Sequence, residues 1–137
     1  MIVEMAVTPG PSPTILLVED EEGVRAVLHE LLTGLGFSVL QAANGAEAVD
    51  LARGHDGVID LVITDMVMPV MSGQELARNL AELRPGVRIL YMSAFASNMY
   101  SPSALANALA DYISKPFDLD TFVSKVRELL SSPRAGT

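Results

Sequence analysis

The chain of 137 residues contains neither cysteine nor tryptophan, and only 5% of its residues are aromatic. Without cysteine it forms no disulfide, no thiolate nucleophile and no zinc site built on sulfur. Basic residues are scarce as well, since 9 Lys and Arg stand against 17 Asp and Glu and give a formal net charge of −8. Such a charge repels the phosphates of nucleic acids and of acidic membranes, so direct binding to either is not expected.

Long apolar runs are also missing. No stretch approaches the roughly 20 apolar residues of a membrane span, and residues 1–7 carry no basic residue, unlike a signal peptide. Because 50% of the residues are apolar, the chain can bury the core of one domain. We expect a soluble, cytoplasmic protein with one domain over 14–131, a flexible Pro-rich lead-in over 1–13 and a short tail over 132–137.

Short apolar runs alternate with segments of helical periodicity. The runs predict strands at 15–18, 38–40, 59–64, 87–92 and 111–114. Helical spacing and capping residues predict helices over 24–35, 44–53, 72–83, 101–110 and 118–130, of which the fourth is poorly defined and is expected to be mobile or displaced. This alternation predicts a doubly wound α/β domain, with a parallel sheet of five strands covered by helices on both faces.

The residues that follow the strands carry the candidate chemistry, because ligands of such sheets bind beyond the carboxyl ends of the strands. Glu19 and Asp20 follow the first run, Asp65 the third, Ser93 the fourth and Lys115 the fifth. Crowded carboxylates either raise a pKa or hold a divalent cation, and oxygen ligands favour Mg2+. A metal and a lysine beside a carboxylate suit phosphoryl transfer through an acyl phosphate, with the serine hydroxyl donating to the new phosphoryl group.

Four motifs in this order resemble the receiver domain of two-component response regulators, over about residues 14–130. They are Leu16-Leu17-Val18-Glu19-Asp20-Glu21 with Arg25, Asp65-Met66-Val67-Met68-Pro69 with Gly73, Tyr91-Met92-Ser93-Ala94 and Tyr112-Ile113-Ser114-Lys115-Pro116-Phe117. The first motif and the region 95–115 look most similar to the receivers of hybrid histidine kinases. The resemblance implies a flavodoxin-like fold with five helices and strand order 2-1-3-4-5.

The resemblance implies that Asp65 is the phosphoacceptor, phosphorylated from a phosphohistidine on a histidine kinase or histidine phosphotransfer protein. Mg2+, or Mn2+, would be bound by Asp20, by Asp65 and by the backbone carbonyl of Val67, with Glu19 acting through water. The family often has Asp where Glu19 stands. Such a domain is a signalling switch that catalyses only its own phosphorylation and dephosphorylation, so no other enzymatic activity is expected.

The resemblance also implies a phosphoryl-binding pair and a switch. Ser93 and Lys115 would bind the phosphoryl oxygens, and the ring of Tyr112 would move inward when the Ser93 hydroxyl is drawn to the phosphate. The surface of the fourth helix, fifth strand and fifth helix would then change and control a downstream protein. Pro116 matches a family proline that often follows a cis bond.

Two apolar residues modify this expectation. Val67 and Phe95 stand two positions after Asp65 and Ser93, where receivers that lose phosphate quickly tend to have polar side chains. Because apolar side chains do not orient an attacking water, we expect slow self-dephosphorylation.

Several alternatives remain. No output domain fits after Leu130, so the chain is expected to be a single-domain regulator or the receiver of a hybrid sensor kinase. A flavodoxin-type binding module is disfavoured, because four consecutive acidic residues follow the first strand in place of a phosphate loop. An Asp-nucleophile phosphatase is disfavoured because it would want a second Asp where Val67 stands. A pseudo-receiver that binds partners without phosphorylation stays open.

Overall fold

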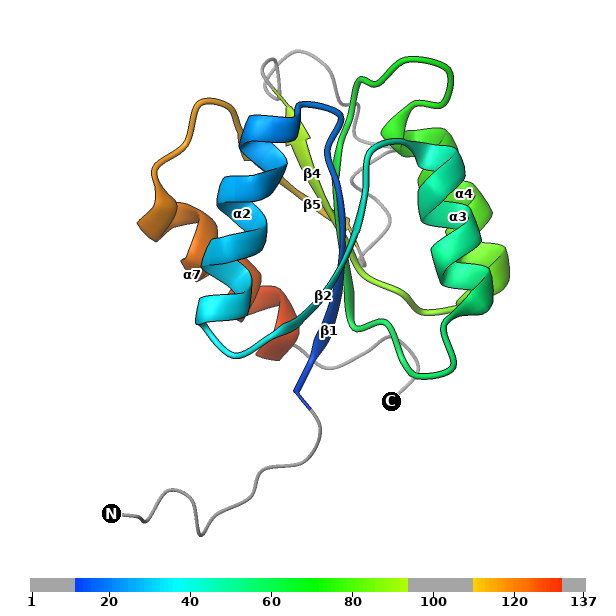
Figure 1. The fold of residues 1–137 in the computed structure, drawn as a ribbon, viewed down its shortest axis with the longest axis horizontal. Coiled ribbons are helices and arrows are strands. Elements are labelled where there is room, and N and C mark those ends of the chain that lie inside the picture. The colour runs from blue at the N-terminus through cyan, green and yellow to red at the C-terminus, as the bar shows by residue number, and fades with distance from the viewer. Residues whose placement is uncertain (1–11, 94–109, 132–137) are drawn as a thin grey trace, which may run out of the picture.

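The computed structural model describes residues 12–93 and 110–131, which build one parallel sheet between two layers of helices (Figure 1). The strands are β1 (Thr14–Val18), β2 (Ser38–Ala42), β3 (Leu61–Asp65), β4 (Ile89–Ser93) and β5 (Ala110–Ser114). All neighbouring strands are parallel, and their order is β2-β1-β3-β4-β5. The predicted doubly wound fold and strand order are therefore confirmed.

Helices cover both faces of the sheet. They are α2 (Glu22–Gly34), α3 (Gly45–Gly54), α4 (Gly73–Leu83) and α7 (Leu119–Ser131). Figure 1 shows α2 and α7 on one face and α3 and α4 on the other. The helix predicted over 101–110 falls outside the described residues, except that Ala110 begins β5.

The central strands are buried on both sides, which explains their nearly continuous apolar sequence. Leu16 and Val62 point into the core beneath α3 and α4, whereas Leu17 and Ile63 point into the core beneath α2 and α7. All four side chains are at most 1% exposed. The two buried cores thus fix the positions of the strand ends relative to each other. The candidate residues lie at those ends.

Side-chain caps form at the starts of three of the described helices, α3, α4 and α7. Asn44 accepts a hydrogen bond from the backbone N–H of Glu47 at 2.9 Å, and Asp118 accepts one from the N–H of Thr121 at 2.7 Å. Ser72 and Glu75 make the reciprocal bonds of a capping box at the start of α4. These caps set where each helix begins. The capping box of Ser72 and Glu75 sets where the loop after Asp65 ends and α4 begins.

The ends of the chain are mostly outside the described residues, which begin at 12 and stop at 131. The division into lead-in, domain and tail therefore stays a prediction. In the described part of the chain, no helix is both long enough and apolar enough to cross a bilayer.

Candidate functional site

The parallel strands bring the predicted residues to one edge of the sheet. Glu19 follows β1, Asp65 ends β3, Ser93 ends β4 and Lys115 follows β5. Asp65 pairs with Met92 across the sheet, so Ser93 lies one residue beyond it on the neighbouring strand. The N–H of Lys115 donates to the carbonyl of Ser93 at 2.8 Å, which joins the last two members.

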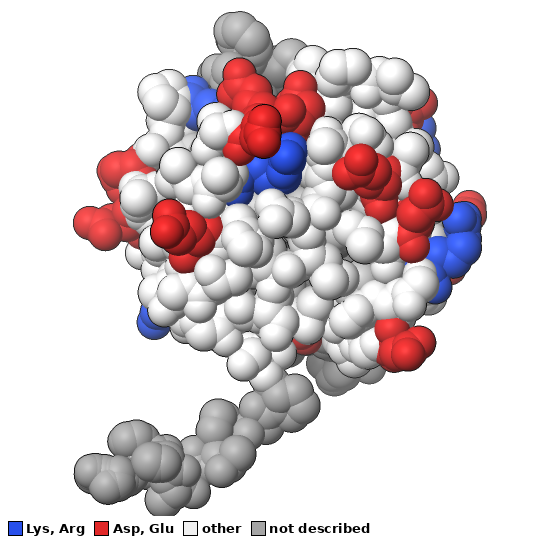
Figure 2. All heavy atoms as spheres, viewed as in Figure 1, with Lys and Arg blue, Asp and Glu red and all other residues white. Residues whose placement is uncertain are grey.

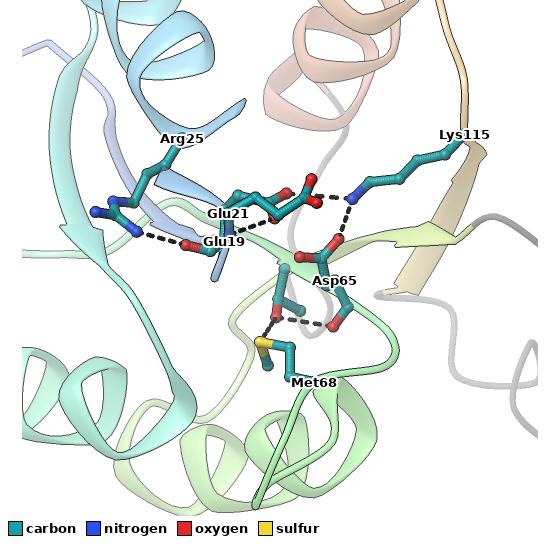
Figure 3. Close-up of polar contacts among 7 residues, drawn as sticks. Glu19, Glu21, Arg25, Asp65, Met68 and Lys115 are labelled. Carbon is teal, nitrogen blue, oxygen red and sulfur yellow. Dashed lines mark hydrogen bonds and ion pairs between the residues drawn. The ribbon is translucent and has the colours of Figure 1, made fainter. Parts of the chain in front are cut away.

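Lys115 lies between two buried carboxylates (Figure 3). Its Nζ is 2.5 Å from Oδ1 of Asp65 and 3.2 Å from Oε1 of Glu19. Glu19 is 0% exposed and Asp65 5%, so both charges interact through a medium that screens them poorly. The lysine is therefore the positive charge that allows two acids to lie side by side in the interior.

The pKa values of this group are shifted. Burial raises the pKa of the Asp65 carboxyl from 3.8 to about 7, and the adjacent Glu19 adds to this effect, while Lys115 opposes it. Burial alone lowers the pKa of Lys115, but its contacts with Asp65 and Glu19 outweigh burial and raise that pKa. The lysine is thus charged at neutral pH, whereas Asp65 changes its charge close to neutrality.

A third carboxylate completes an acidic cluster. Glu19, Asp20 and Asp65 each offer an oxygen, and these oxygens lie within 4.8 Å of one another. Asp20 is exposed, and Oδ2 of Asp65 has no hydrogen-bond partner among the residues that the structure describes. A buried carboxylate oxygen without a donor, beside two further carboxylates, fits a hard divalent cation such as Mg2+.

The loop after β1 is held by Arg25. Its guanidinium donates to the carbonyl of Glu19 at 2.8 Å, and Oε2 of Glu19 accepts from the N–H of Glu21 at 3.1 Å. Figure 3 shows Arg25 pointing away from Lys115, toward the backbone of the loop. The sequence motif includes Arg25 but does not indicate its role. In the structure Arg25 positions the acidic loop that follows β1.

The loop after Asp65 is held by Thr64 and Gly73. The hydroxyl of Thr64 contacts the carbonyl of Asp65 at 3.0 Å and the sulfur of Met68 at 3.9 Å. The N–H of Gly73 donates to the carbonyl of Met66 at 2.9 Å. A Cβ on Gly73 would lie 2.2 Å from the carbonyl oxygen of Asp65, so only glycine allows this approach. Sequence reasoning missed Thr64, because a threonine inside an apolar strand carries no distinctive signal.

The tip of this loop is apolar and exposed. The side chain of Val67 is 66% exposed, and Val70 is fully exposed. Val70 has φ +70°, and the N–H of Met71 donates to the carbonyl of Pro69 at 2.7 Å across it. The metal role predicted for the Val67 carbonyl stays a prediction, and Phe95 lies outside the described residues.

The predicted switch residue lies beside a second aromatic ring. Tyr112 on β5 is half-buried and pairs across the sheet with Tyr91 on β4. Their ring centroids are 5.5 Å apart and the ring planes are inclined by 35°. Burial, with a contribution from Tyr112, raises the pKa of Tyr91 to about 12. The bond between Lys115 and Pro116 is cis, as the resemblance implies.

Comparison with known proteins gives consistent results. A model described as the response regulator receiver domain matches residues 15–127. Sensor kinase CckA from Brucella abortus (strain 2308) is 35% identical over 128 residues, which are 93% of this chain but only 14% of that kinase. Response regulator receiver protein CpdR from the same organism is 36% identical over 116 residues, 85% of this chain and 95% of CpdR.

Two solved structures are also similar to this chain. The crystal structure of the receiver domain from hybrid histidine kinase CckA has a TM-score of 0.74 and 31% identity, and covers 86% of this chain and 99% of its own. Response regulator TrrA from Thermotoga maritima, in complex with Mg2+–BeF, has a TM-score of 0.70 and 33% identity, over 85% of this chain and 98% of its own. The chain therefore belongs to the response regulator receiver domain family, whose members are phosphorylation-dependent signalling switches of two-component systems.

Proposed function

We propose that Asp65 is the phosphoacceptor of this switch and that a histidine kinase or histidine phosphotransfer protein supplies the phosphoryl group. The observation that carries the proposal is the state of the two Asp65 oxygens. Oδ1 is 2.5 Å from the ammonium of Lys115, while the buried Oδ2 has no hydrogen-bond partner among the described residues. One oxygen is thus held in place and the other is available for bond formation.

The transfer is a displacement at phosphorus. A bond forms between phosphorus and a carboxylate oxygen of Asp65 as the bond from phosphorus to the histidine nitrogen breaks. The electron pair of that bond stays on the imidazole, which takes a proton from solvent and leaves as neutral histidine. Lys115 is close enough to move from Asp65 to the phosphoryl oxygens, where its charge stabilises the negative charge on the transferred group.

We assign the metal site to Glu19, Asp20 and Asp65, with the Val67 carbonyl as a further ligand. The oxygens of the three carboxylates lie within 4.8 Å of one another, which supports the assignment. Mg2+ bound there would neutralise negative charge on the attacking carboxylate and on the phosphoryl group. The Mg2+–BeF complex of the relative TrrA is in line with this choice. Glu19 would contact the metal through water, as the resemblance to receiver domains implies.

The output of the switch starts at Ser93 and Tyr112. Ser93 is 4% exposed and ends the strand beside Asp65, and we assign its hydroxyl the role of donor to the phosphoryl group. Tyr112 is on the adjacent strand and packs on Tyr91, and we propose that it carries a shift of Ser93 to β5. We propose that β5, α7 and the helix predicted over 101–110, which falls outside the described residues except for Ala110, form the surface that controls a downstream protein.

The relatives include a long sensor kinase and a regulator nearly as short as this chain. Both arrangements fit, a single-domain regulator and the receiver of a hybrid kinase. In each, the chain catalyses only its own phosphorylation and dephosphorylation. The pseudo-receiver alternative gains no support, because Glu19, Asp65 and Lys115 are brought into direct contact. A cytoplasmic location stays a prediction.

The test is intact mass after incubation with phosphoramidate, with Mg2+ and with EDTA. We expect one phosphoryl group on the wild type in Mg2+, none in EDTA and none on Asp65→Asn. The conservative variant Asp50→Asn, at an exposed position on α3, is expected to be labelled like the wild type. A folded wild type that accepts no phosphoryl group from phosphoramidate or from any phosphohistidine protein would establish the pseudo-receiver instead.

A further inference from the structure

Arg25 lies near the start of α2, shortly after four consecutive acidic residues. These residues are Glu19, Asp20, Glu21 and Glu22, and Figure 2 shows acidic side chains gathered over the start of α2. Like charges in so short a segment repel one another and favour an open loop. Bonds from other side chains therefore have to hold this segment beside the phosphoacceptor.

The start of α2 has no side-chain cap to do this. Asn44, Ser72 and Asp118 cap the other three described helices. The side chain of Glu21, at the N-cap position of α2, makes no capping bond. An uncapped start leaves backbone N–H groups without a side-chain acceptor and is more easily rearranged. The loop from β1 into α2 therefore depends on bonds made elsewhere.

Arg25 makes such a bond. Its Nη1 donates to the backbone carbonyl of Glu19 at 2.8 Å and so closes the loop that contains Asp20 (Figure 3). The N–H of Glu19 donates to the carbonyl of Ala42 at 3.1 Å. Because Glu19 is 0% exposed, its carbonyl would lose its donor and gain little water if Arg25 were removed. Arg25 thus helps to set the direction in which the chain leaves Glu19 toward Asp20.

The position of Asp20 depends on this backbone, because its side chain has no other support. The side chain is exposed, and no described residue makes a hydrogen bond or an ion pair with it. Its carboxylate nevertheless belongs to the cluster with Glu19 and Asp65, whose oxygens lie within 4.8 Å of one another. Ligands that are held close before a cation arrives lose less entropy when it binds. The bond from Arg25 therefore favours cation binding.

The positive charge of Arg25 has the opposite effect, because it repels a cation. Figure 3 shows Arg25 pointing away from Lys115, toward the backbone of the loop. The side chain is only partly buried, so solvent and salt screen its charge. We expect the gain from positioning to exceed this repulsion. The two effects predict opposite changes in Mg2+ affinity when Arg25 is replaced by a neutral residue.

We propose that Arg25 is a positioning residue of the metal site, which holds the loop after β1 so that Asp20 and Asp65 bind Mg2+ without rearrangement. Arg25 thereby raises the affinity of the site for Mg2+ and takes no direct part in phosphoryl transfer. This inference rests on the proposed function, because it needs the metal site assigned to these carboxylates.

The experiment measures Mg2+ binding directly, without a phosphodonor. Isothermal titration calorimetry gives the Mg2+ dissociation constants of wild type, Arg25→Met and Arg53→Met. Methionine keeps the apolar stem of arginine but has neither its charge nor its donors. Arg53→Met is the matched control, because Arg53 lies in the last turn of α3 and makes an exposed ion pair with Asp50. Arg25→Gln, which is neutral and shorter by two bonds, stands in if Arg25→Met does not fold.

We expect Arg25→Met to raise the Mg2+ dissociation constant about tenfold, which corresponds to about 1.4 kcal/mol, and Arg53→Met to leave it unchanged. Labelling of Arg25→Met by phosphoramidate is slower than that of wild type at low Mg2+ concentration. It returns to the wild-type rate once Mg2+ saturates the site. Such recovery is not explained by damage to the fold, because a distorted site stays slow at any Mg2+ concentration.

Other outcomes overturn the inference. An unchanged dissociation constant for Arg25→Met would make the bond to Glu19 irrelevant to the metal, and a lower one would show that the charge of Arg25 outweighs its positioning. Labelling that stays slow at saturating Mg2+ would mean that Arg25 supports the fold rather than the metal site.

Failure of the proposed function gives a different result. A wild type that binds no Mg2+ would overturn the metal assignment and this inference together. A wild type that binds Mg2+, with the expected loss in Arg25→Met, but accepts no phosphoryl group would overturn Asp65 as phosphoacceptor and support the role of Arg25.

Discussion

At the scale of single residues, the negative charge of Asp65 destabilises the fold, because the folded state raises the pKa of its carboxyl. Its carboxyl is 5% exposed and lies beside the equally buried Glu19, with Lys115 as their shared counter-charge. Burial, with a contribution from the neighbouring Glu19, raises the pKa of Asp65 to about 7, and the single ammonium of Lys115 does not offset the two effects. A cation bound at the site would reduce this unfavourable charge.

The first prediction follows from this pKa. A raised folded-state pKa contributes stability below the unfolded value of 3.8, and this contribution is lost as the pH rises through about 7. The free energy of unfolding of wild type should therefore fall relative to Asp65→Asn, on the order of 2 kcal/mol between about pH 5 and about pH 8. Urea denaturation in EDTA at the two pH values measures it.

Magnesium provides the control. At the higher pH, Mg2+ should stabilise wild type and have little effect on Asp65→Asn, because binding to the folded state alone adds to its stability. Parallel pH profiles for the two proteins in EDTA would show that Asp65 is not destabilised by its charge.

The second prediction concerns Val67. Its exposed side chain offers no hydrogen bond to a water that attacks the acyl phosphate. Val67→Asn should therefore speed loss of phosphate severalfold, as measured by intact mass after the phosphodonor is removed, whereas Val58→Asn at the far end of the sheet should leave it unchanged. A fast wild-type rate that Val67→Asn does not alter would sink the expectation of slow self-dephosphorylation.

At the scale of elements, the loop from β3 to α4 depends on one glycine. A Cβ on Gly73 would lie 2.2 Å from the carbonyl oxygen of Asp65 and 3.0 Å from Cα of Met66, both of which are backbone atoms that cannot turn aside. The start of α4 thus packs directly on the phosphoacceptor strand. Helix propensity alone favours alanine at this position, so it predicts that Gly73→Ala raises the free energy of unfolding. The close contact predicts that the same substitution lowers it.

The third prediction is that Gly73→Ala lowers the free energy of unfolding by about 1–3 kcal/mol and slows labelling by phosphoramidate, because the backbone of Asp65 has to move. Gly54→Ala at the end of α3 is the matched control, since nothing lies within 4 Å of its Cβ position. Urea denaturation and intact mass give the two readouts. Gly73→Ala as stable as Gly54→Ala would contradict the close approach.

The sequence predicted the elements and the strand ends well, and for a physical reason. Asp65 and Lys115 follow apolar runs, and the carboxyl ends of parallel strands meet at one edge. Helix caps such as Ser72 are also predicted by the sequence, because a cap depends only on residues a few positions away. The positive φ of Val70 was not predicted, because valine is among the residues least suited to it. Thr64 and Arg25 were missed as positioning residues, because their partners are known only once the loops are folded.

At the scale of the whole molecule, the two helices on one face are joined by a long-range clamp. Arg84, which follows α4, donates to the carbonyls of Ala52 at 2.8 Å, His55 at 2.5 Å and Gly57 at 2.5 Å. These carbonyls lie at the end of α3 and in the turn beyond it, where helix acceptors lack partners. These bonds hold the C-terminal ends of α3 and α4 together. Nη1 and Nη2 of the planar guanidinium reach the three acceptors from two separate nitrogens, a fork that the single nitrogen of a lysine does not match.

The fourth prediction is that Arg84→Lys lowers the free energy of unfolding by about 2 kcal/mol, because lysine replaces only part of the three bonds. Arg53→Lys is the control, since Arg53 makes an exposed pair with Asp50 at 3.6 Å that contributes little. Chemical denaturation of both variants measures the difference. Equal stabilities would mean that the clamp is absent in solution.

The most direct measurement of the central claim locates the phosphoryl group in the chain. Wild type is phosphorylated by phosphoramidate in Mg2+, reduced with borohydride and digested, because reduction of an aspartyl phosphate leaves homoserine in place of aspartate. We predict homoserine at position 65 alone, and none in samples treated with EDTA. Homoserine at Asp20, or at any other position with Asp65 intact, would contradict the assignment of the phosphoacceptor.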